Sequence, residues 1–278
     1  MNRIQSNFGN TQLLMSARMR SYPMLSKLVK RIFGYTQLGN YARAGIFKKI
    51  INQLPLKNYS KVLDLGCGQG EYSFMMAKSF PKLSITALDI ESERIQKIKE
   101  LASNQELHNL KTHLGPIDSF PVKDGNFDFI YSIDVFEHLS EDKMPFEAAH
   151  QRLKQEGVLV IKMPSKKQST LLPARLFEEH AEWLEDEHIG QIYELEDLKN
   201  RMQSAGFEIV DAFYADGPLA RLGWEISYLA KKISLILHLL LLPFTKILVR
   251  IDQLNPKRKK GNTIQVIGKK IKSYAKDQ

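Results

Sequence analysis

The sequence predicts an α/β protein built on a doubly wound sheet, because strands and helices are expected to alternate through the middle of the chain. Short apolar runs alternate there with amphipathic helical patterns. Three glycines at alternate positions, Gly66, Gly68 and Gly70, follow the first apolar run. The first two runs end in acids, Asp64 and Asp89. Ligands bind at the carboxyl ends of strands in such sheets.

The first strand and loop have the sequence KVLDLGCGQGEYS, Lys61 to Ser73. Val62, Leu63 and Leu65 predict a short buried strand, and Glu71 predicts the start of a helix. Glycine lets the turn adopt positive φ and lets a ligand approach bare backbone. A strand, a glycine loop and a helix in this order surround one small ligand with backbone N–H groups and a helix N-terminus.

The spacing of the glycines distinguishes two nucleotide-like ligands. A dinucleotide-binding loop has the spacing G-x-G-x-x-G and closes on a pyrophosphate, whereas this loop has G-x-G-x-G, with Asp64 two residues before the first glycine. An acid so close to the loop suits a cationic amino group better than a phosphate. VLDLGCGQG resembles the first motif of the class I S-adenosylmethionine (SAM) methyltransferases, in which the loop holds the methionine end of the cofactor. The alternative is a chance glycine turn in another α/β protein.

The resemblance implies cofactor contacts from Asp64, Gly66, Cys67, Gly68 and Gly70. Cys67 is the only cysteine, so there is no disulfide framework and a reducing compartment is indicated. Its position favours a small residue packed beneath the loop over a nucleophile.

Two further strands carry other cofactor candidates. SITALDI, Ser84 to Ile90, predicts a second strand. The resemblance assigns Asp89 the ribose hydroxyls, since an acid about twenty residues beyond the loop can accept both of them, and Ile90 follows it. A third strand, LKTHL, leads to a turn in which Ile117 and Asp118 are candidates for contact with adenine. The alternative for Asp118 is a solvated loop carboxylate.

A fourth strand, Phe127 to Asp134, contains Ser132 as a further cofactor candidate and is followed by VFEHL. The segment IDVFEHL resembles the fourth motif of small-molecule methyltransferases, including the quinone-pathway O-methyltransferases. Asp134, Glu137 and His138 form a set able to deprotonate a hydroxyl or to hold a divalent cation that does so. The alternatives are that Asp134 caps a helix and that Glu137 orients the loop. We assign no metal to the site.

The strand ends in neither D-P-P-Y nor N-P-P-Y, nor in Pro-Cys, so methylation of DNA bases is not expected. A helix end, a turn and a fifth strand follow within Leu153 to Pro164. The long connection from Lys166 to Tyr193 contains Phe177 and His180 and is expected to shape the acceptor pocket, or else to be a solvated surface. His138 is the first candidate for the catalytic base, and His188, in the same connection, is the second.

Phe207 to Asp216 predicts a sixth strand and Asn262 to Lys270 a seventh. The resemblance implies a Rossmann-like seven-stranded mixed sheet, with the seventh strand antiparallel and helices on both faces. The core then comprises residues 58–216 and 262–278, preceded by basic helices in 1–57 and interrupted by a hydrophobic helical insertion at 217–261.

Charge is unevenly distributed along the 278 residues, which carry a formal net charge of +9. Eleven Lys and Arg and no acid lie in residues 1–63, and thirteen Lys and Arg against three acids lie in residues 217–278. Basic arms suit an anionic partner, either membrane headgroups or nucleic acid. The polar N-terminus predicts no signal peptide, which favours the cytoplasm.

Trp224 to Ile251 is strongly apolar but too short and too often interrupted for a membrane span of about 20 residues. Ser227, Lys231, Ser234 and His238 fall on one stripe of an otherwise apolar helix, which Pro243 is expected to kink or divide. We expect this helix to lie in a membrane interface next to anionic lipids. A buried cap or a homodimer interface is the alternative. An apolar helix has no role against nucleic acid.

The resemblance therefore implies a SAM-dependent methyltransferase. The insertion favours a hydrophobic or lipid-linked small-molecule acceptor, methylated on oxygen at the cytoplasmic face of a membrane. The N-terminal helices are expected to cover the cofactor, with Tyr41 and Arg43 either facing it or serving in packing. The alternatives are a methyltransferase acting on RNA or protein, and a non-catalytic adaptor with the same fold.

Overall fold

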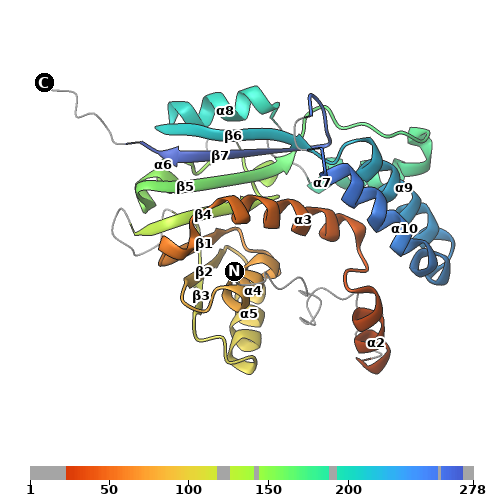
Figure 1. The fold of residues 1–278 in the computed structure, drawn as a ribbon, viewed down its shortest axis with the longest axis horizontal. Coiled ribbons are helices and arrows are strands. Elements are labelled where there is room, and N and C mark those ends of the chain that lie inside the picture. The colour runs from red at the N-terminus through yellow and green to blue at the C-terminus, as the bar shows by residue number, and fades with distance from the viewer. Residues whose placement is uncertain (1–22, 118–125, 141–143, 188–192, 256–257, 272–278) are drawn as a thin grey trace, which may run out of the picture.

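The computed structural model describes residues 23–117, 126–140, 144–187, 193–255 and 258–271. A seven-stranded sheet forms the centre, in the order β3-β2-β1-β4-β5-β7-β6 (Figure 1). Its strands are β1 (Lys61–Leu65), β2 (Ser84–Asp89), β3 (Leu110–Leu114), β4 (Phe127–Ile133), β5 (Leu153–Pro164), β6 (Phe207–Ala215) and β7 (Thr263–Lys270). The first five strands are parallel, and β7 runs antiparallel to both β5 and β6. The predicted mixed sheet is confirmed.

Helices cover both faces of the sheet. They are α2 (Pro23–Phe33), α3 (Leu38–Gln53), α4 (Glu71–Ser79), α5 (Ser92–Asn104), α6 (Phe146–Arg152), α7 (Glu178–Glu187), α8 (Leu195–Ser204), α9 (Pro218–Ile233) and α10 (Leu235–Gln253), with short 3-10 turns η3 (Leu56–Asn58), η5 (Phe136–His138) and η7 (Ala174–Phe177). The core beneath α3, α4 and α5 is separate from the core beneath α6 and α8.

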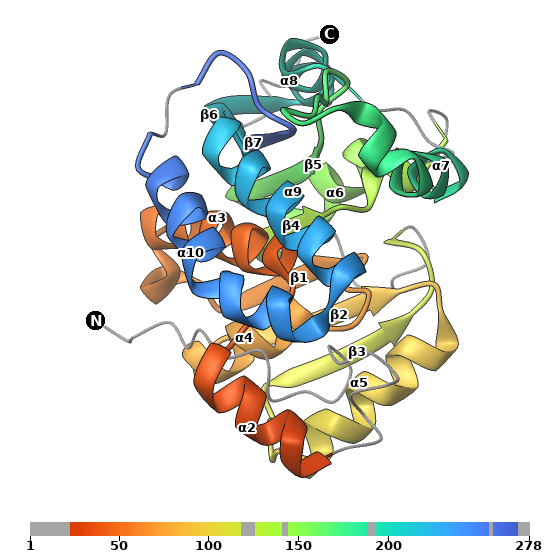
Figure 2. The ribbon, with the colours of Figure 1, turned by 90° about the vertical axis from the view of Figure 1, so that its right-hand side faces the viewer.

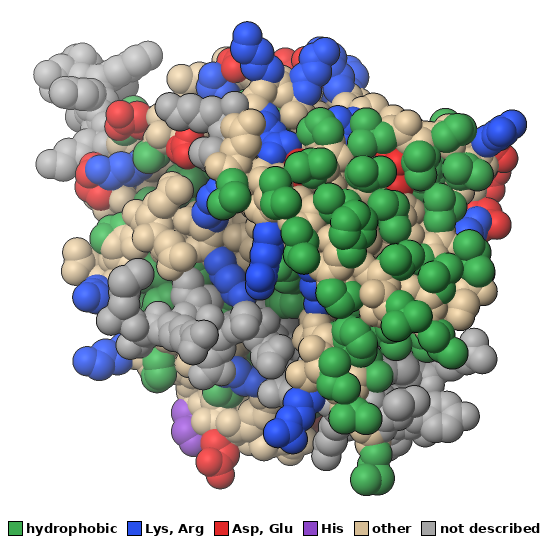
Figure 3. All heavy atoms as spheres, turned by 45° about the vertical axis from the view of Figure 1, so that its right-hand side comes forward, with side chains coloured by type: hydrophobic (Ala, Val, Ile, Leu, Met, Phe, Trp, Pro, Cys, Tyr) green, Lys and Arg blue, Asp and Glu red, His purple; other side chains and the backbone are tan. Residues whose placement is uncertain are grey.

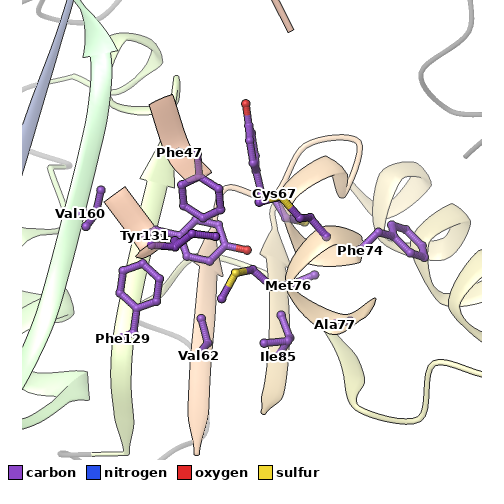
Figure 4. Close-up of a cluster of buried hydrophobic side chains, with 14 of the residues drawn as sticks. Phe47, Val62, Cys67, Phe74, Met76, Ala77, Ile85, Phe129, Tyr131 and Val160 are labelled. Atoms are coloured by element: carbon purple, nitrogen blue, oxygen red, sulfur yellow. The ribbon is translucent and has the colours of Figure 1, made fainter. Parts of the chain in front are cut away.

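The apolar pattern expected before the first strand forms α3 and packs directly on the sheet. Figure 4 shows Phe47 of α3 against Tyr131 and Phe129 of β4, and the ring centroids of Phe47 and Tyr131 lie 4.8 Å apart. Ile50 and Ile51 are equally buried. Burial of these side chains fixes α3 on one face of the sheet, because each contributes about 1.5–3 kcal/mol when it leaves water.

The insertion between β6 and β7 is a hairpin of two helices, so the prediction of one helix divided at Pro243 is wrong. The break is at Ser234, whose backbone is extended and whose hydroxyl accepts a hydrogen bond from Ile236 N at 3.2 Å. Ser234 therefore caps α10, as serine commonly does. Pro243 lies inside α10, which runs on to Gln253.

The polar stripe expected along one helix is also wrong, because its residues are divided between two. Ser227 and His238 are buried and face each other across the hairpin, with Oγ and Nδ1 3.3 Å apart. The other imidazole nitrogen of His238 lies 2.9 Å from Thr36 O, just before α3. Figure 2 shows the hairpin lying across α3, with α2 beside α10.

Boundaries differ slightly elsewhere. The segment expected to contain a helix end and a turn before the fifth strand is all strand, since β5 begins at Leu153, which pairs with Phe127. Glu156 bends this strand through a left-handed conformation with φ of 63°. Among the described residues, no helix has both the length and the apolarity that a bilayer crossing requires.

Candidate active site

The glycine loop after β1 needs glycine at its ends for steric reasons. Gly66 and Gly70 both have φ of 74°, in the left-handed region that other residues seldom adopt. A Cβ on Gly66 would lie 2.5 Å from Val135 Cγ2, and one on Gly70 would lie 2.9 Å from Ile98 Cγ1. The loop thus packs tightly on the chain beneath it.

The middle of the loop is open by contrast. Gly68 has φ of 52°, and a Cβ there would meet only Arg94 Nη1, at 3.9 Å. Gly66 N and Cys67 N both donate to Leu88 O, at 2.9 and 2.8 Å. The loop is therefore tied to β2 from below while its upper backbone is left bare. Cys67 is buried, as expected, and burial raises the pKa of its thiol well above the ordinary value.

Asp89, at the end of β2, holds the loop from the other side. Its Oδ2 accepts from Gly68 N at 2.8 Å, and its Oδ1 accepts from Glu91 N at 3.0 Å. Each carboxylate oxygen has a second lone pair, so both oxygens can accept further hydrogen bonds from hydroxyl groups. Ile90, the next residue, is exposed beside it.

Asp64 lies beneath the loop and is almost completely buried. Its Oδ2 accepts from Ser73 Oγ of α4 at 2.5 Å. Burial raises the pKa of Asp64 to about 7, although the hydrogen bond from Ser73 opposes the rise. Ser132 of β4 is buried too and donates to Leu65 O at 2.9 Å, so its hydroxyl joins β4 to β1.

Of the two cofactor candidates in the turn after β3, Ile117 is described in the structure and Asp118 is not. Ile117 is buried in the core beneath α6 and α8. Asp118 lies outside the described residues, and so does His188.

Asp134, immediately after β4, joins three parts of the chain. Its Oδ2 accepts from Arg43 Nη1 of α3 at 2.7 Å, and its Oδ1 accepts from Lys162 Nζ of β5 at 2.5 Å. Burial alone would raise the pKa of Asp134, but the charges of Lys162 and Arg43 outweigh it and hold the pKa below its ordinary value. With φ of 53°, this carboxylate is directed to two cations rather than to a helix cap.

Glu137, one turn further on, is buried, and its Oε2 has no hydrogen-bond partner among the described residues. Burial raises the pKa of Glu137, and the negative charge of Asp134 raises it further. An unpaired carboxyl in such surroundings is costly unless a ligand completes its hydrogen bonds. His138, its neighbour, is exposed.

Asp134, Glu137 and His138 line a cavity of about 870 Å³. Its walls come from α3, the end of β5, η7 and the start of α7, both helices of the hairpin and the start of β7. Phe177 and His180 line it as expected, and Trp224 packs beside them with its ring tilted, 4.8 Å from His180 between ring centroids. This volume suits a small organic molecule.

A family model described as a methyltransferase domain matches residues 56–210, which is more than half of the sequence. The chain belongs to the class I SAM-dependent methyltransferases.

Individual relatives of this methyltransferase agree with that assignment. Trans-aconitate 2-methyltransferase of Deinococcus radiodurans is 29% identical over 124 residues, which are 45% of this chain and 45% of the relative. Phosphoethanolamine N-methyltransferase of Triticum aestivum is 26% identical over 185 residues, which are 66% of this chain and 34% of the relative. The chain thus spans less than half the length of these curated relatives.

The solved structures show the same fold. Phosphoethanolamine N-methyltransferase 2 of Haemonchus contortus, in complex with phosphomonomethylethanolamine and S-adenosylhomocysteine, gives a TM-score of 0.58 at 18% identity. The superposition covers 96% of this methyltransferase and 60% of that chain.

The residues at the loop fit SAM on two observations. Gly68 leaves bare backbone beside the Asp89 carboxylate. Glu71, the first residue of α4, has a buried Oε1 without a partner among the described residues. A buried acceptor beside the loop is suited to a donor such as the cofactor's ammonium group.

Sequence reasoning missed two parts of this site. It did not connect Lys162 with Asp134, and it left Arg43 undecided between cofactor contact and packing. Tyr41, considered with Arg43, instead packs against α10, where its hydroxyl accepts from Arg250 Nε at 2.5 Å. The described residues contain no cluster of His, Cys, Asp and Glu that could hold a metal ion.

Proposed function

We propose that this methyltransferase transfers a methyl group to a hydrophobic or lipid-linked small molecule at a membrane surface, with oxygen as the acceptor atom. One observation carries the proposal. The hairpin that walls the cavity also presents an exposed apolar face to the outside.

The apolar face is formed by large side chains of α2 and α10, with the turn before α10. Figure 3 shows hydrophobic side chains gathered on this part of the surface. Its exposed members are Met24, Leu28, Ile32, Ile233, Leu235, Ile236, Leu240, Phe244, Ile247, Ile251 and Leu254. On both helices they recur at three- and four-residue spacing, so each helix presents one continuous stripe. Monomeric soluble proteins rarely expose so large a contiguous patch without a binding role.

Cations flank the apolar face and suit an anionic bilayer. Arg31 is exposed beside Ile32, Lys231 and Lys232 end α9, and Arg250 is exposed beside Ile251. Each Lys or Arg near an anionic membrane surface adds about 1 kcal/mol of attraction. Apolar side chains that enter the interface and cations that remain at the headgroups are the two components of monotopic binding.

For the cofactor, we propose that Asp64, Gly66, Cys67, Gly68, Gly70, Asp89, Ile90, Ile117, Asp118 and Ser132 form the SAM site. When bound, SAM supplies an electrophilic methyl group carried on sulfur. Asp89 is placed to accept hydrogen bonds from the ribose hydroxyls. Asp64 and Ser132 support the loop from below.

At the acceptor, we propose that Glu137 takes the proton from the hydroxyl group. Glu137 lines the cavity, its Oε2 has no hydrogen-bond partner among the described residues, and a raised pKa brings a carboxyl nearer to the pKa that a base needs at neutral pH. His138, exposed at the same cavity, is placed to pass the proton to solvent, and His188 is retained as an alternative to it. Asp134 positions Arg43 and Lys162.

Vesicle flotation tests the membrane part of the proposal. The full-length protein should float with vesicles containing phosphatidylglycerol, and more weakly with neutral phosphatidylcholine. Leu240→Glu with Phe244→Glu should reduce the bound fraction at least tenfold, because two apolar anchors become anions. Val210→Glu, at an equally exposed site on β6, should float like the wild type.

Either of two results would contradict the membrane part of the proposal. They are a wild type that stays in solution with both vesicles, or a double variant that floats unchanged. A concentration-dependent dimer that the double variant abolishes would assign the apolar face to a second copy instead.

Turnover tests the chemistry. With SAM and vesicles of total membrane lipid, the wild type should release S-adenosylhomocysteine. Glu137→Gln should lower the rate about 100-fold or more while SAM affinity measured by calorimetry is unchanged. Glu147→Gln, on the exposed face of α6, serves as the matched control. Equal rates for Glu137→Gln and the wild type would exclude Glu137 as the base.

A further inference from the structure

We infer that Arg221 binds an anionic group of the acceptor, so that the substrate is an acidic amphiphile carrying a carboxylate or a phosphate. The inference rests on the proposed function, since it specifies the chemistry of the hydrophobic acceptor.

Arg221 is the cavity cation without a countercharge. Arg43 and Lys162 are both paired with Asp134. Arg221, in the first turn of α9, also lines the cavity, but it forms no ion pair with any residue that the structure describes. Arg221 is partly exposed in the cavity wall, and a cation without an anionic partner in its own chain is available to pair with an anionic group of a ligand.

Ser169 holds one nitrogen of this guanidinium, Nη1. Nη1 donates to Ser169 Oγ and to Ser169 O, the latter at 3.3 Å. Nε is buried and has no partner within the described part of the chain. Nη2 forms no hydrogen bond with the described residues, and a charged N–H donor of this kind forms a strong hydrogen bond with an oxygen of a carboxylate or phosphate.

The polar groups around Arg221 are held in place by hydrogen bonds. Asn262 Nδ2 donates to Ser169 O at 3.0 Å, and Ser169 N donates to Asn262 Oδ1 at 3.2 Å. These bonds fix the loop after β5 against the start of β7. Glu225, one turn along α9 from Arg221, is occupied by the backbone of the same loop, because its oxygens accept from Leu171 N and Leu172 N at 2.8 and 2.9 Å.

The other side of the cavity is apolar. Leu38 and Ala42 of α3 meet Ala220 and Val249 of the hairpin in a small buried cluster that also lines the cavity. A ligand with an apolar body and one anionic group satisfies both parts of the lining. A neutral alcohol would leave Arg221 without a countercharge, and a cationic ligand would be repelled by it.

Calorimetry with chain-matched probes tests the inference on the full-length protein. The probes are dodecanoate, dodecyl phosphate and dodecanol, each below its critical micelle concentration and with S-adenosylhomocysteine present. The wild type should bind at least one anion tenfold or more tightly than the alcohol. Arg221→Gln should lose that preference and bind the alcohol as before. Arg175→Gln, an exposed arginine outside the cavity lining, is the matched control.

The variant Ser169→Ala distinguishes ligand binding by Arg221 from a purely structural role of its contact with Ser169. This variant removes the hydroxyl that holds Nη1 but keeps the guanidinium, so it should retain the preference for the anion. Equal affinity of the wild type for anion and alcohol would overturn the inference without any variant. So would a parallel loss of both affinities in Arg221→Gln.

Flotation distinguishes this inference from the proposed function. Arg221→Gln should float with vesicles like the wild type, since Arg221 is not part of the apolar face. A wild type that floats and turns over but shows no anion preference contradicts the inference alone. A wild type that binds the anions but never floats contradicts the membrane proposal alone.

Discussion

Asp64 and Asp89 lie near the carboxyl ends of the neighbouring strands β1 and β2, at the candidate cofactor site, but their surroundings differ. Asp89 accepts hydrogen bonds from two backbone N–H groups, one of which belongs to the loop itself. Asp64 is enclosed under that loop with one hydrogen bond from a neutral hydroxyl. A single neutral donor offsets little of the cost of burying a charge, so the protonated form of Asp64 is favoured until a cation arrives.

This difference predicts how stability depends on pH. Because the pKa of Asp64 is raised to about 7 in the folded protein, its stabilising contribution is complete below pH 4 and is lost as pH rises through 7. In urea titrations without SAM, the free energy of unfolding of the wild type relative to Asp64→Asn should fall by roughly 3–5 kcal/mol between pH 4 and 8. Asp211→Asn, an exposed control, should show no such trend. A constant difference between wild type and Asp64→Asn would show that Asp64 is already ionised in the fold.

At the scale of elements, the hairpin is joined to the N-terminal helices by polar contacts inside and apolar contacts around them. His238 connects α10 to α9 through Ser227 and to the turn before α3 through Thr36 O. Lys246 of α10 donates to Phe33 O at the end of α2. These polar contacts lie beside a small buried apolar cluster that includes Leu38 of α3, Ala220 of α9 and Leu242 of α10.

A double-mutant cycle measures the interaction between Ser227 and His238, which joins the two helices of the hairpin. His238→Phe leaves Thr36 O and the Ser227 hydroxyl without their partner, at a cost of about 1–3 kcal/mol in urea unfolding. Ser227→Ala alone should cost less, and the double variant should cost less than the sum of the two, since the pair acts together. Strict additivity would show that Ser227 and His238 do not interact in solution.

The hairpin also shows where sequence patterns fail. Ser227, Lys231, Ser234 and His238 match one helical stripe in spacing, and only the extended backbone at Ser234 turns that stripe into two facing helices. Proline is the stronger helix breaker in general. Here the exposed position of Pro243 in the middle of α10 allows the helix to continue around it.

Across the whole molecule, features set by short stretches of chain were predicted well. The glycine loop and Asp89 follow from a local motif and a spacing of about twenty residues, and the mixed seven-stranded sheet was expected from the resemblance to the family. The Asp134 network did not follow, because Arg43 is 91 residues and Lys162 is 28 residues away in sequence. The packing of α3 on the face of the sheet, with Arg43 near the carboxyl end of β4, brings these groups together. No local pattern records that packing.

The two ends of the insertion lie side by side. Ala215 and Thr263 pair across β6 and β7, Asn262 N donates to Asp216 O at 3.2 Å, and a Cβ on Gly261 would lie 2.1 Å from Ala215 O. The sheet would therefore close in the same register with a short turn in place of the hairpin. An insertion of this kind can be gained or exchanged in evolution without any change in the strand order of the sheet. Because this insertion supplies Arg221 and the α10 part of the apolar face, the proposed membrane attachment and the proposed acceptor choice would be inherited together.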